Sequence, residues 1–237
     1  MPHCVFLPGT MNDQRLWSLV WPLLPADFDC VHVPLERAAS RQAMQQMIGE
    51  TCHADSHLIG FSMGAYLALE FASLQPRQWR SLSLLAVNSQ GLADDEARLR
   101  QHMLNWLAGH RYTGMARQRL LQLLHPQQQT PKLMDLIRAM DLELGHDVLL
   151  TQLSQTQQRA DLSVALTQFA DRLLMIQGEA DALIPKQALQ VMRLAAAQAE
   201  WHSLPATGHV LPLEQPQALA QLLSDFIRRQ ATPIKMA

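Results

Sequence analysis

A serine lies between two glycines in the pentapeptide Gly-Phe-Ser-Met-Gly, residues 60–64. The apolar run 56–62 leads into it, and the apolar segment 65–74 follows with helical spacing. Where a strand turns directly into a helix through such a pentapeptide, the small residues allow close packing and the serine hydroxyl stands above the carboxyl edge of a sheet. A plain strand-to-helix turn is the alternative. The pattern favours Ser62 as a nucleophile, with the unpaired N–H of Met63 directed at the same place.

A serine nucleophile needs a base, and the base needs a carboxylate to fix its tautomer. His209, one of 10 histidines, follows a strand-like run and a glycine in "LPATGHVLPLEQP". Asp181 lies in "GEADALIP", directly after another strand-like run. A surface histidine, and a helix N-cap before Pro185, are the alternatives, and the N-cap role could coexist with catalysis. Glu179 is a competing carboxylate that ranks below Asp181. The order Ser, Asp, His suits three loops at one sheet edge.

A tetrahedral oxyanion also needs two hydrogen-bond donors. Met63 N–H is the first, and the second is expected from the loop "LPGTMNDQRLW" after the first strand-like run. Gly9 lets this backbone turn in closely, so that Thr10 or Met11 presents an N–H. Thr10 is favoured, and a loop without this role is the alternative.

The elements that would position these residues alternate between strand-like and helix-like segments. The strand-like runs are almost continuously apolar, as in parallel sheets covered on both faces. They span residues 3–9, 28–35, 56–62, 81–88, 171–181 and 199–209. Apolar residues at helical spacing occupy 44–53, 65–74, 185–199 and 216–230. The alternation predicts a doubly wound α/β fold with a mostly parallel sheet of about six strands.

Residues 90–160 interrupt this alternation. They are rich in Leu, Gln, Arg and Met, and they predict helices over 94–110, 116–125, 131–145 and 146–159. We expect a core of residues 1–89 and 161–237, with a helical lid over 90–160 inserted between the fourth and fifth strands. The tail after Arg229 is expected to be loose.

The Gly-x-Ser-x-Gly turn, the Asp181 and His209 loops and the Pro8-Gly9 loop together resemble the α/β-hydrolase superfamily over nearly the whole chain. The chain is similar to its compact, lid-bearing bacterial members, such as pimeloyl-carrier-protein methyl esterases, enol-lactonases and the lyase of menaquinone synthesis. In such proteins a run like 158–162 joins the lid to the core. This chain has Pro8-Gly9 where the superfamily usually has His-Gly, which bears on the second oxyanion donor. The resemblance also implies a short sheet that lacks the common N-terminal strand pair.

A pocket under a lid is expected to be apolar, with few polar groups. The candidates for its lining are Met11, Trp106, Met115, Leu124, Met134 and Val210, and other apolar lid residues are Met103, Leu107, Leu121, Ile137 and Met140. Spacing leaves open which of them form the lid's own core. The lid arginines are Arg111, Arg117, Arg119, Arg138 and Arg159, either on solvated helix faces or as receivers of an acidic group. A lid rich in Met and Leu suits a flexible acyl chain.

The composition and the absence of other motifs limit the partners, cofactors and location that we expect. Of 237 residues 48% are hydrophobic, and the formal net charge is −2, so neither a nucleic-acid partner nor a membrane surface is expected. Three cysteines without a CxxC pair indicate reduced thiols. No leader segment is visible, and a cytoplasmic location is expected. The sequence shows no phosphate loop, dinucleotide fingerprint or metal-ligand spacing, so no cofactor or metal is expected.

The sequence therefore predicts a serine hydrolase that cleaves a carboxylic ester or thioester of a small-to-medium apolar acyl group. The acyl group could be free or bound to a carrier. A lyase that uses the same triad for proton abstraction is one alternative, and a non-enzymatic ligand-binding member of the fold is another. The natural substrate and the oligomeric state stay open.

Overall fold

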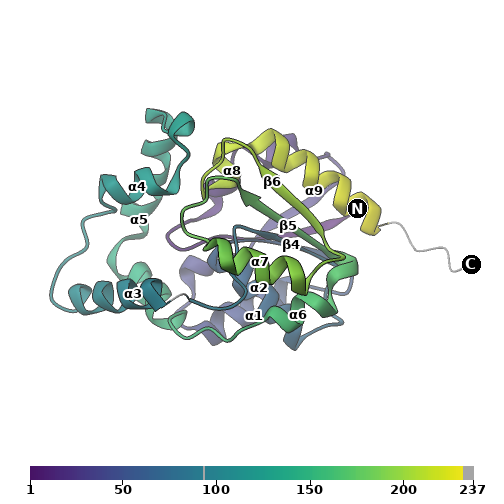
Figure 1. The fold of residues 1–237 in the computed structure, drawn as a ribbon, viewed down its shortest axis with the longest axis horizontal. Helices are drawn as coiled ribbons and strands as arrows, with labels where there is room; N and C mark the ends of the chain where they lie inside the picture. The colour runs from purple at the N-terminus through teal and green to yellow at the C-terminus, as the bar shows by residue number, and fades with distance from the viewer. Residues whose placement is uncertain (93, 232–237) are drawn as a thin grey trace, which may run out of the picture.

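The structure is a computed structural model, and it describes residues 1–92 and 94–231. Its centre is a six-stranded sheet in the order β2-β1-β3-β4-β5-β6, with every neighbouring pair parallel (Figure 1). The strands are β1 (His3–Leu7), β2 (Asp29–His32), β3 (Ser56–Phe61), β4 (Ser81–Leu85), β5 (Leu173–Gly178) and β6 (Glu200–Leu204). The predicted α/β fold with a parallel sheet of six strands is confirmed, and each strand lies within one of the six apolar runs.

Helices cover both faces of this sheet. Val5 and Leu7 of β1 pack in one apolar cluster with helices α1 (Arg41–Thr51), α2 (Met63–Leu74), α6 (Ser163–Gln168) and α7 (Lys186–Ala195). The alternate residues Cys4 and Phe6 pack in a second cluster with the turn η1 (Gln14–Trp17) and with α8 (Leu211–Glu214) and α9 (Pro216–Ala231). Since both sets of alternating side chains are buried, β1 is apolar from Cys4 to Leu7. The edge strands β2 and β6 are less buried and contain polar residues. The short elements η1, η2 (Trp21–Leu23), η3 (Leu35–Arg37), η5 (Ala170–Arg172), α6 and α8 were not predicted.

Residues 90–160, which we call the helical insertion, lie beside the sheet between β4 and β5 (Figure 1). They contain α3 (Asp94–Leu107), α4 (Arg117–Leu123), η4 (Pro126–Gln128) and α5 (Pro131–Gln155). The two helices expected over 131–145 and 146–159 are both present within α5 and meet at Gly145, whose φ of 74° and ψ of −162° are not helical. Gly145 has no Cβ, so it can adopt this conformation without a steric penalty.

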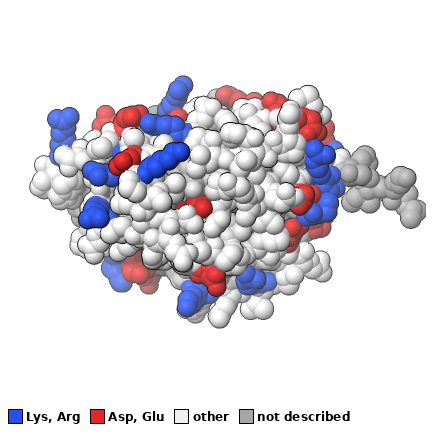
Figure 2. All heavy atoms as spheres, turned by 90° about the horizontal axis from the view of Figure 1, so that it is seen from above, with Lys and Arg blue, Asp and Glu red and all other residues white. Residues whose placement is uncertain are grey.

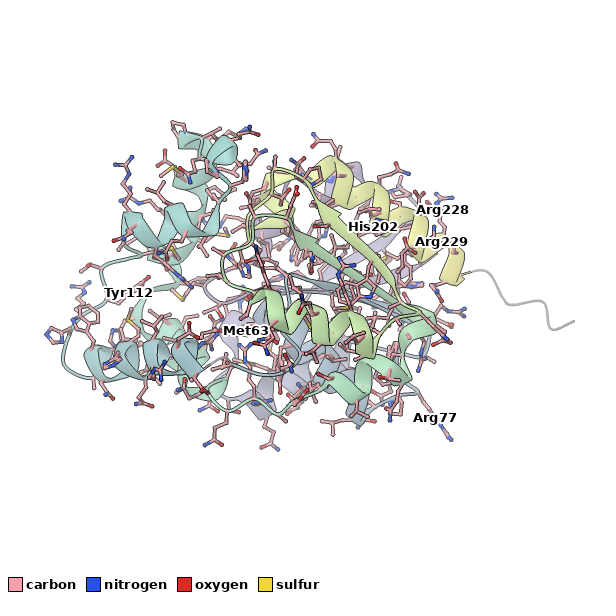
Figure 3. The ribbon with its side chains drawn as sticks, viewed as in Figure 1. Met63, Arg77, Tyr112, His202, Arg228 and Arg229 are labelled. Atoms are coloured by element: carbon pink, nitrogen blue, oxygen red, sulfur yellow. The ribbon has the colours of Figure 1, made fainter. Side chains whose placement is uncertain are left out.

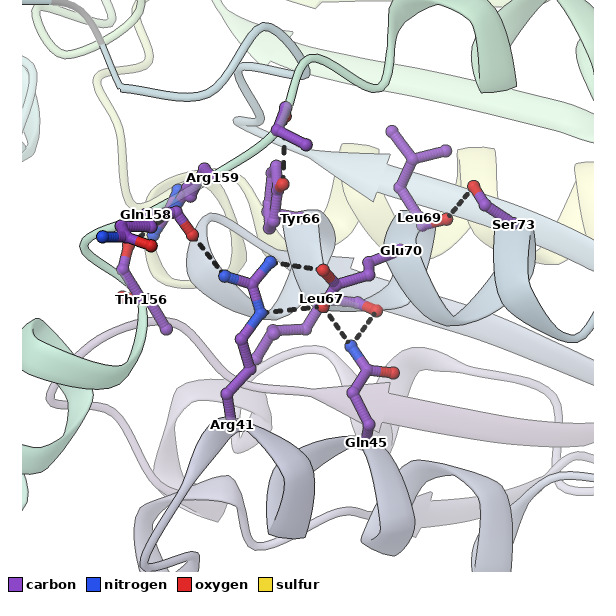
Figure 4. A network of polar contacts seen from close by, with 11 residues as sticks. Arg41, Gln45, Tyr66, Leu67, Leu69, Glu70, Ser73, Thr156, Gln158 and Arg159 are labelled. Carbon is purple, nitrogen blue, oxygen red and sulfur yellow. Dashed lines mark hydrogen bonds and ion pairs between the residues drawn. The ribbon is translucent and has the colours of Figure 1, made fainter.

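Polar contacts fasten the end of the insertion to the core (Figure 4). The Arg41 guanidinium binds the Glu70 carboxylate of α2 and also donates to the carbonyl oxygen of Gln158. The Tyr66 hydroxyl, also on α2, donates to the carbonyl oxygen of Ala160 at 3.0 Å. A cavity of about 560 Å³ beside this junction is lined by Arg41, Leu92, Ala97, Gln157, Gln158, Arg159 and Ala160. Tyr66 and Glu70 lie about one and two helical turns from Ser62, which caps α2, so the junction and the nucleophile are held by the same helix.

The surface of the protein carries charge of both signs. Acidic and basic side chains are interspersed on the face shown in Figure 2, around a broad uncharged area. Among the described residues, no helix combines the length and apolarity needed to cross a membrane. The three cysteines carry free thiols. Helix α9 continues through Ala231, so the expected loose tail is wrong for residues 230 and 231, and the remainder of that tail lies outside the described residues.

Candidate active site

Ser62 occupies the turn between β3 and α2 with φ 51° and ψ −112°. This positive φ is unfavourable for a residue with a side chain, and such strain costs on the order of 1–3 kcal/mol. It persists because both flanking elements are fixed: β3 is buried along its whole length, and the Ser62 N–H donates to the Leu85 carbonyl oxygen at 2.9 Å. The side chain of the half-buried serine is thereby held up at the carboxyl edge of the sheet.

The two glycines of the pentapeptide allow this turn to pack against two neighbours. A Cβ atom on Gly60 would lie 2.5 Å from the Ala65 Cα, so glycine is needed for α2 to fold back on β3. A Cβ atom on Gly64 would lie 2.4 Å from the Pro8 carbonyl oxygen. The loop after β1 therefore approaches the start of α2 directly, which brings residues 8–11 next to the nucleophile.

Ser62, His209 and Asp181 meet at this edge in a continuous hydrogen-bonded chain. His209 Nε2 lies 3.1 Å from Ser62 Oγ, and His209 Nδ1 lies 2.8 Å from Asp181 Oδ2. The side chains of His209 and Asp181 are 6% and 2% exposed. The three residues come from separate loops that follow β3, β5 and β6. This geometry allows a proton to pass from the hydroxyl to the imidazole while the carboxylate orients the ring.

The environment of Asp181 keeps its carboxylate ionised. Burial raises its pKa, but the charge of His209 and the hydrogen bonds from His209 and from the Leu183 N–H more than offset this, so the pKa is below its usual value. Helix α7 begins at Lys186 with Pro185 at its cap, so the N-cap interpretation of Asp181 is wrong. The rival carboxylate Glu179 is exposed, and no contact with His209 is seen.

A buried glutamate that the sequence reasoning missed holds the histidine loop. Glu214 is 4% exposed, and it accepts hydrogen bonds from the backbone N–H groups of Gly208 at 2.8 Å and Val210 at 2.9 Å, on either side of His209. It also accepts from the N–H of His125 in the helical insertion at 2.7 Å. Burial raises the pKa of Glu214 despite these bonds. The sequence did contain a signal for this role, because Glu214 is the one acidic residue in the apolar stretch that follows the Gly-His pair.

Backbone amides near Ser62 differ in their availability. Met63 begins α2, and neither its N–H nor that of Thr10 donates a hydrogen bond within the described part of the chain. The N–H of Met11, in contrast, donates to Gln152 Oε1 at 2.8 Å. Of the two amides considered in this loop, that of Thr10 therefore stays free. Figure 3 places Met63 on the side of the core that faces the helical insertion.

Four of the expected pocket residues gather in one apolar cluster. Leu124 and Val210 are buried in the cluster that also contains Phe61, and Met115 and Met134 pack against it. The Phe61 ring lies 5.2 Å from the His209 ring, centroid to centroid. Phe61 therefore joins His209 to this cluster, which extends over the face of the sheet that α9 covers.

The other two expected pocket residues lie outside this cluster. Met11 packs in a separate small cluster with Leu107 of α3. Trp106 is 42% exposed and stacks on His110, so no described contact brings it to Ser62. The arginines predicted for the lid are mostly exposed: Arg111, Arg117, Arg119 and Arg138, with Arg159 half-buried. In residues 1–92 and 94–231, no group of three or more His, Cys, Asp and Glu side chains is arranged to hold a metal ion.

Comparison with known proteins agrees with the fold. The model of the alpha/beta hydrolase family matches residues 4–222, and the chain belongs to this family of hydrolase-type enzymes. It is 27% identical over 265 residues to the biotin biosynthesis bifunctional protein BioHC of Cellvibrio japonicus, with 98% of this chain and 49% of that protein covered. It is 31% identical over 244 residues to the dihydrolipoyllysine-residue acetyltransferase component of the acetoin cleaving system of Pseudomonas putida, with 95% and 63% covered. The chain thus spans less than two thirds of the length of these relatives.

Solved structures show the same fold. A thermophilic esterase from Thermogutta terrifontis superposes with a TM-score of 0.83 at 20% identity, over 98% of this chain and 91% of that chain. MenH from S. aureus superposes with a TM-score of 0.80 at 17% identity, over 98% and 95%. At these identities the two likenesses establish the fold alone.

Proposed function

We propose that the chain is a serine hydrolase that cleaves a carboxylic ester or thioester through an acyl-enzyme. The observation that carries this proposal is the chain of contacts from Ser62 to His209 at 3.1 Å and from His209 to Asp181 at 2.8 Å. Membership of the alpha/beta hydrolase family supports it.

In the first half of the reaction, Ser62 Oγ attacks the substrate carbonyl carbon while His209 Nε2 takes the hydroxyl proton. The carbonyl π electrons move to the oxygen, and the N–H groups of Met63 and Thr10 stabilise the resulting oxyanion. His209 then gives its proton to the departing alcohol or thiol as the bond between the carbonyl carbon and the leaving group breaks. The Asp181 carboxylate stabilises the imidazolium in both steps.

In the second half, water replaces the leaving group. His209 Nε2 removes a proton from a water molecule, whose oxygen attacks the acyl-enzyme carbonyl at the same oxyanion site. Collapse of this intermediate releases the carboxylic acid, and the proton returns from His209 to Ser62 Oγ. In this scheme the two half-reactions together consume one water molecule and release the alcohol or thiol and the carboxylic acid, and no step draws on a metal or an organic cofactor.

The acyl group in this proposal is small to medium and largely apolar. Phe61 lies beside His209, and Leu124, Val210, Met115 and Met134 belong to or pack against the same apolar cluster, from which a pocket for such a group would be built. Two relatives bear names that refer to biotin biosynthesis and to a dihydrolipoyllysine acetyltransferase component, which is compatible with an acyl group attached to a carrier. A free ester and a carrier-bound thioester both fit the chemistry described.

The test compares hydrolysis of short p-nitrophenyl esters by the unaltered protein and by Ser62→Ala. We expect loss of turnover by roughly 10⁵–10⁶-fold in the variant, with an unchanged circular dichroism spectrum. Ser81→Ala, which removes another histidine-bonded hydroxyl, is the matched control and should keep its activity. Equal turnover in Ser62→Ala would overturn the proposal. Stable binding without any turnover would instead favour a non-enzymatic member, and reaction without hydrolysis would favour a lyase.

A further inference from the structure

Gln152 is a buried amide that touches the loop after β1. It lies on α5, in the helical insertion, with 1% of its surface exposed. Its Oε1 accepts the hydrogen bond from the Met11 N–H at 2.8 Å. Because a backbone N–H can only donate, the carboxamide oxygen has to face Met11, which fixes the orientation of the whole group.

The other half of this amide has no partner. Gln152 Nε2 is buried and makes no hydrogen bond within the described residues. The buried apolar side chains that cluster with Met11 on this side are Leu107, Leu149 and Leu153. The hydroxyl of Tyr112, which packs against this cluster, donates to the Asp141 carboxylate. A buried NH₂ group without an acceptor is unfavourable, and buried polar groups in folded proteins are nearly always paired. The unused donor therefore indicates an acceptor that the protein itself does not supply.

The position of Gln152 indicates where that acceptor comes from. Met11 directly follows Thr10, whose free N–H is the proposed second oxyanion donor. The Gln152 amide is thus bound to the residue that directly follows the proposed oxyanion donor. Water could occupy this position in the absence of substrate, but a substrate oxygen would replace it only if it offered the same hydrogen bond.

We infer that Gln152 is a specificity-determining residue whose Nε2 binds a second acceptor oxygen carried by the acyl group near the scissile carbonyl. This inference rests on the proposed hydrolase function. It narrows the substrate class from simple alkanoyl esters to oxo-substituted acyl esters, of which a 3-oxoacyl ester is the smallest convenient example. The alcohol or thiol portion of the substrate is not restricted by this contact.

The chain provides a matched control in Gln155, which is on the same helix three residues later. Its Oε1 accepts a backbone N–H, that of Arg41 at 3.2 Å, and it is half-buried. It therefore has the same chemistry and the same role in joining α5 to the core, but it binds the start of α1 and not the loop that contains Thr10.

The experiment measures kcat/KM for ethyl 3-oxobutanoate and for ethyl butanoate by titration of the released acid. The unaltered protein should prefer the oxo ester by about tenfold, the value of one hydrogen bond. Gln152→Met and Gln152→Glu should both abolish this preference, and Gln155→Met should keep it. The Glu variant retains an acceptor for the Met11 N–H but has no NH₂ donor, so it separates the substrate contact from support of the loop.

The outcomes distinguish the inference from the function on which it rests. An unchanged ratio in both Gln152 variants, or no preference in the unaltered protein, would overturn the inference while Ser62-dependent hydrolysis stands. An equal loss of activity toward both esters would give Gln152 a role in supporting the loop only, and it would also overturn the inference. Hydrolysis of neither ester in a Ser62-dependent manner would overturn the proposed function, and the inference with it.

Discussion

Two buried histidines of this protein each pair with a serine hydroxyl, at opposite ends of the sheet. His57, in β3, places Nδ1 2.6 Å from the Oγ of Ser81, the first residue of β4. His209, at the carboxyl edge, places Nε2 3.1 Å from Ser62 Oγ. Their relative exposures are 1% and 5%. By residue type, distance and burial, the two pairs are closely similar.

Their surroundings differ in ways that matter for chemistry. His209 has a carboxylate on its second ring nitrogen, and its serine is half-buried beside two free backbone amides. His57 lacks such a carboxylate contact among the described residues, and Ser81 is buried. Burial, together with the charge of Arg80, lowers the pKa of His57 to about 4. A Ser-His pair is therefore a candidate active site only where it also has an orienting carboxylate, donors for an oxyanion and an open position for substrate.

The largest expected effect separates the two histidines directly. His209→Gln should lower kcat for ester hydrolysis by roughly 10⁵-fold or more, since the serine loses its base. His57→Gln should leave kcat within about threefold at pH 8, because no step of the mechanism uses it. Initial rates with p-nitrophenyl butyrate measure both variants. Comparable losses in the two variants would remove the proposed distinction between the two ends of the sheet.

The second effect concerns the carboxylate that distinguishes His209. Asp181→Asn preserves the shape of the side chain but favours the wrong imidazole tautomer, so kcat should fall by about 10⁴-fold. Glu179→Gln, a change at the neighbouring exposed carboxylate, should leave kcat nearly unchanged. Steady-state kinetics with the same ester checks both. A greater loss of kcat in the Glu179 variant would mean that Glu179, and not Asp181, is the carboxylate that orients His209.

The third effect is a difference in acid stability caused by His57. Its folded pKa of about 4 lies below the unfolded value of 6.5, so the unfolded chain takes up the proton first. The stability is therefore fully present above pH 6.5 and falls toward pH 4, by roughly 3 kcal/mol in total at about 1.4 kcal/mol per pH unit. Urea unfolding over this range should show the loss in the unaltered protein and a flatter profile in His57→Gln. The exposed His102→Gln should retain the original slope, and an equal flattening there would contradict this assignment.

The smallest expected effect concerns the support of the His209 loop. Glu214→Gln exchanges one acceptor oxygen for an NH₂ group that faces a backbone N–H, so the free energy of unfolding should fall by about 1–3 kcal/mol. Because the loop carries His209, kcat should fall more than KM changes. Glu143→Gln, at a carboxylate whose side chain is 64% exposed, should alter the unfolding free energy by less than about 1 kcal/mol. Thermal denaturation and kinetics together test this, and unchanged values for Glu214→Gln would show that the buried carboxylate does not hold the loop.

The elements that carry Ser62, Asp181 and His209 could be predicted because their signals are local. Each residue follows a short apolar run, and a parallel sheet brings the ends of such runs to one edge. The pentapeptide around Ser62 also requires small residues at two known positions, for the close contacts seen at Gly60 and Gly64. The sheet and its long helices follow from the same periodicities.

Other parts of the site depend on contacts between distant segments. Gln152 meets Met11 across 141 positions, and nothing in the local pattern of α5 selects this glutamine over Gln155. Trp106 was expected to line a pocket because it is large and apolar, yet α3 presents it to solvent beside His110. Helical spacing defines the faces of a helix, but packing decides which face meets the core.

The most direct test of the account is the intact mass of the protein after incubation with a fluorophosphonate, followed by peptide mapping. Attack by an activated serine expels fluoride and leaves one phosphonyl group on the oxygen. We predict a single adduct per chain on Ser62, with none on Ser81 and none in the His209→Gln variant. An unmodified protein, or an adduct on any other serine, would contradict the claim that Ser62, His209 and Asp181 act together.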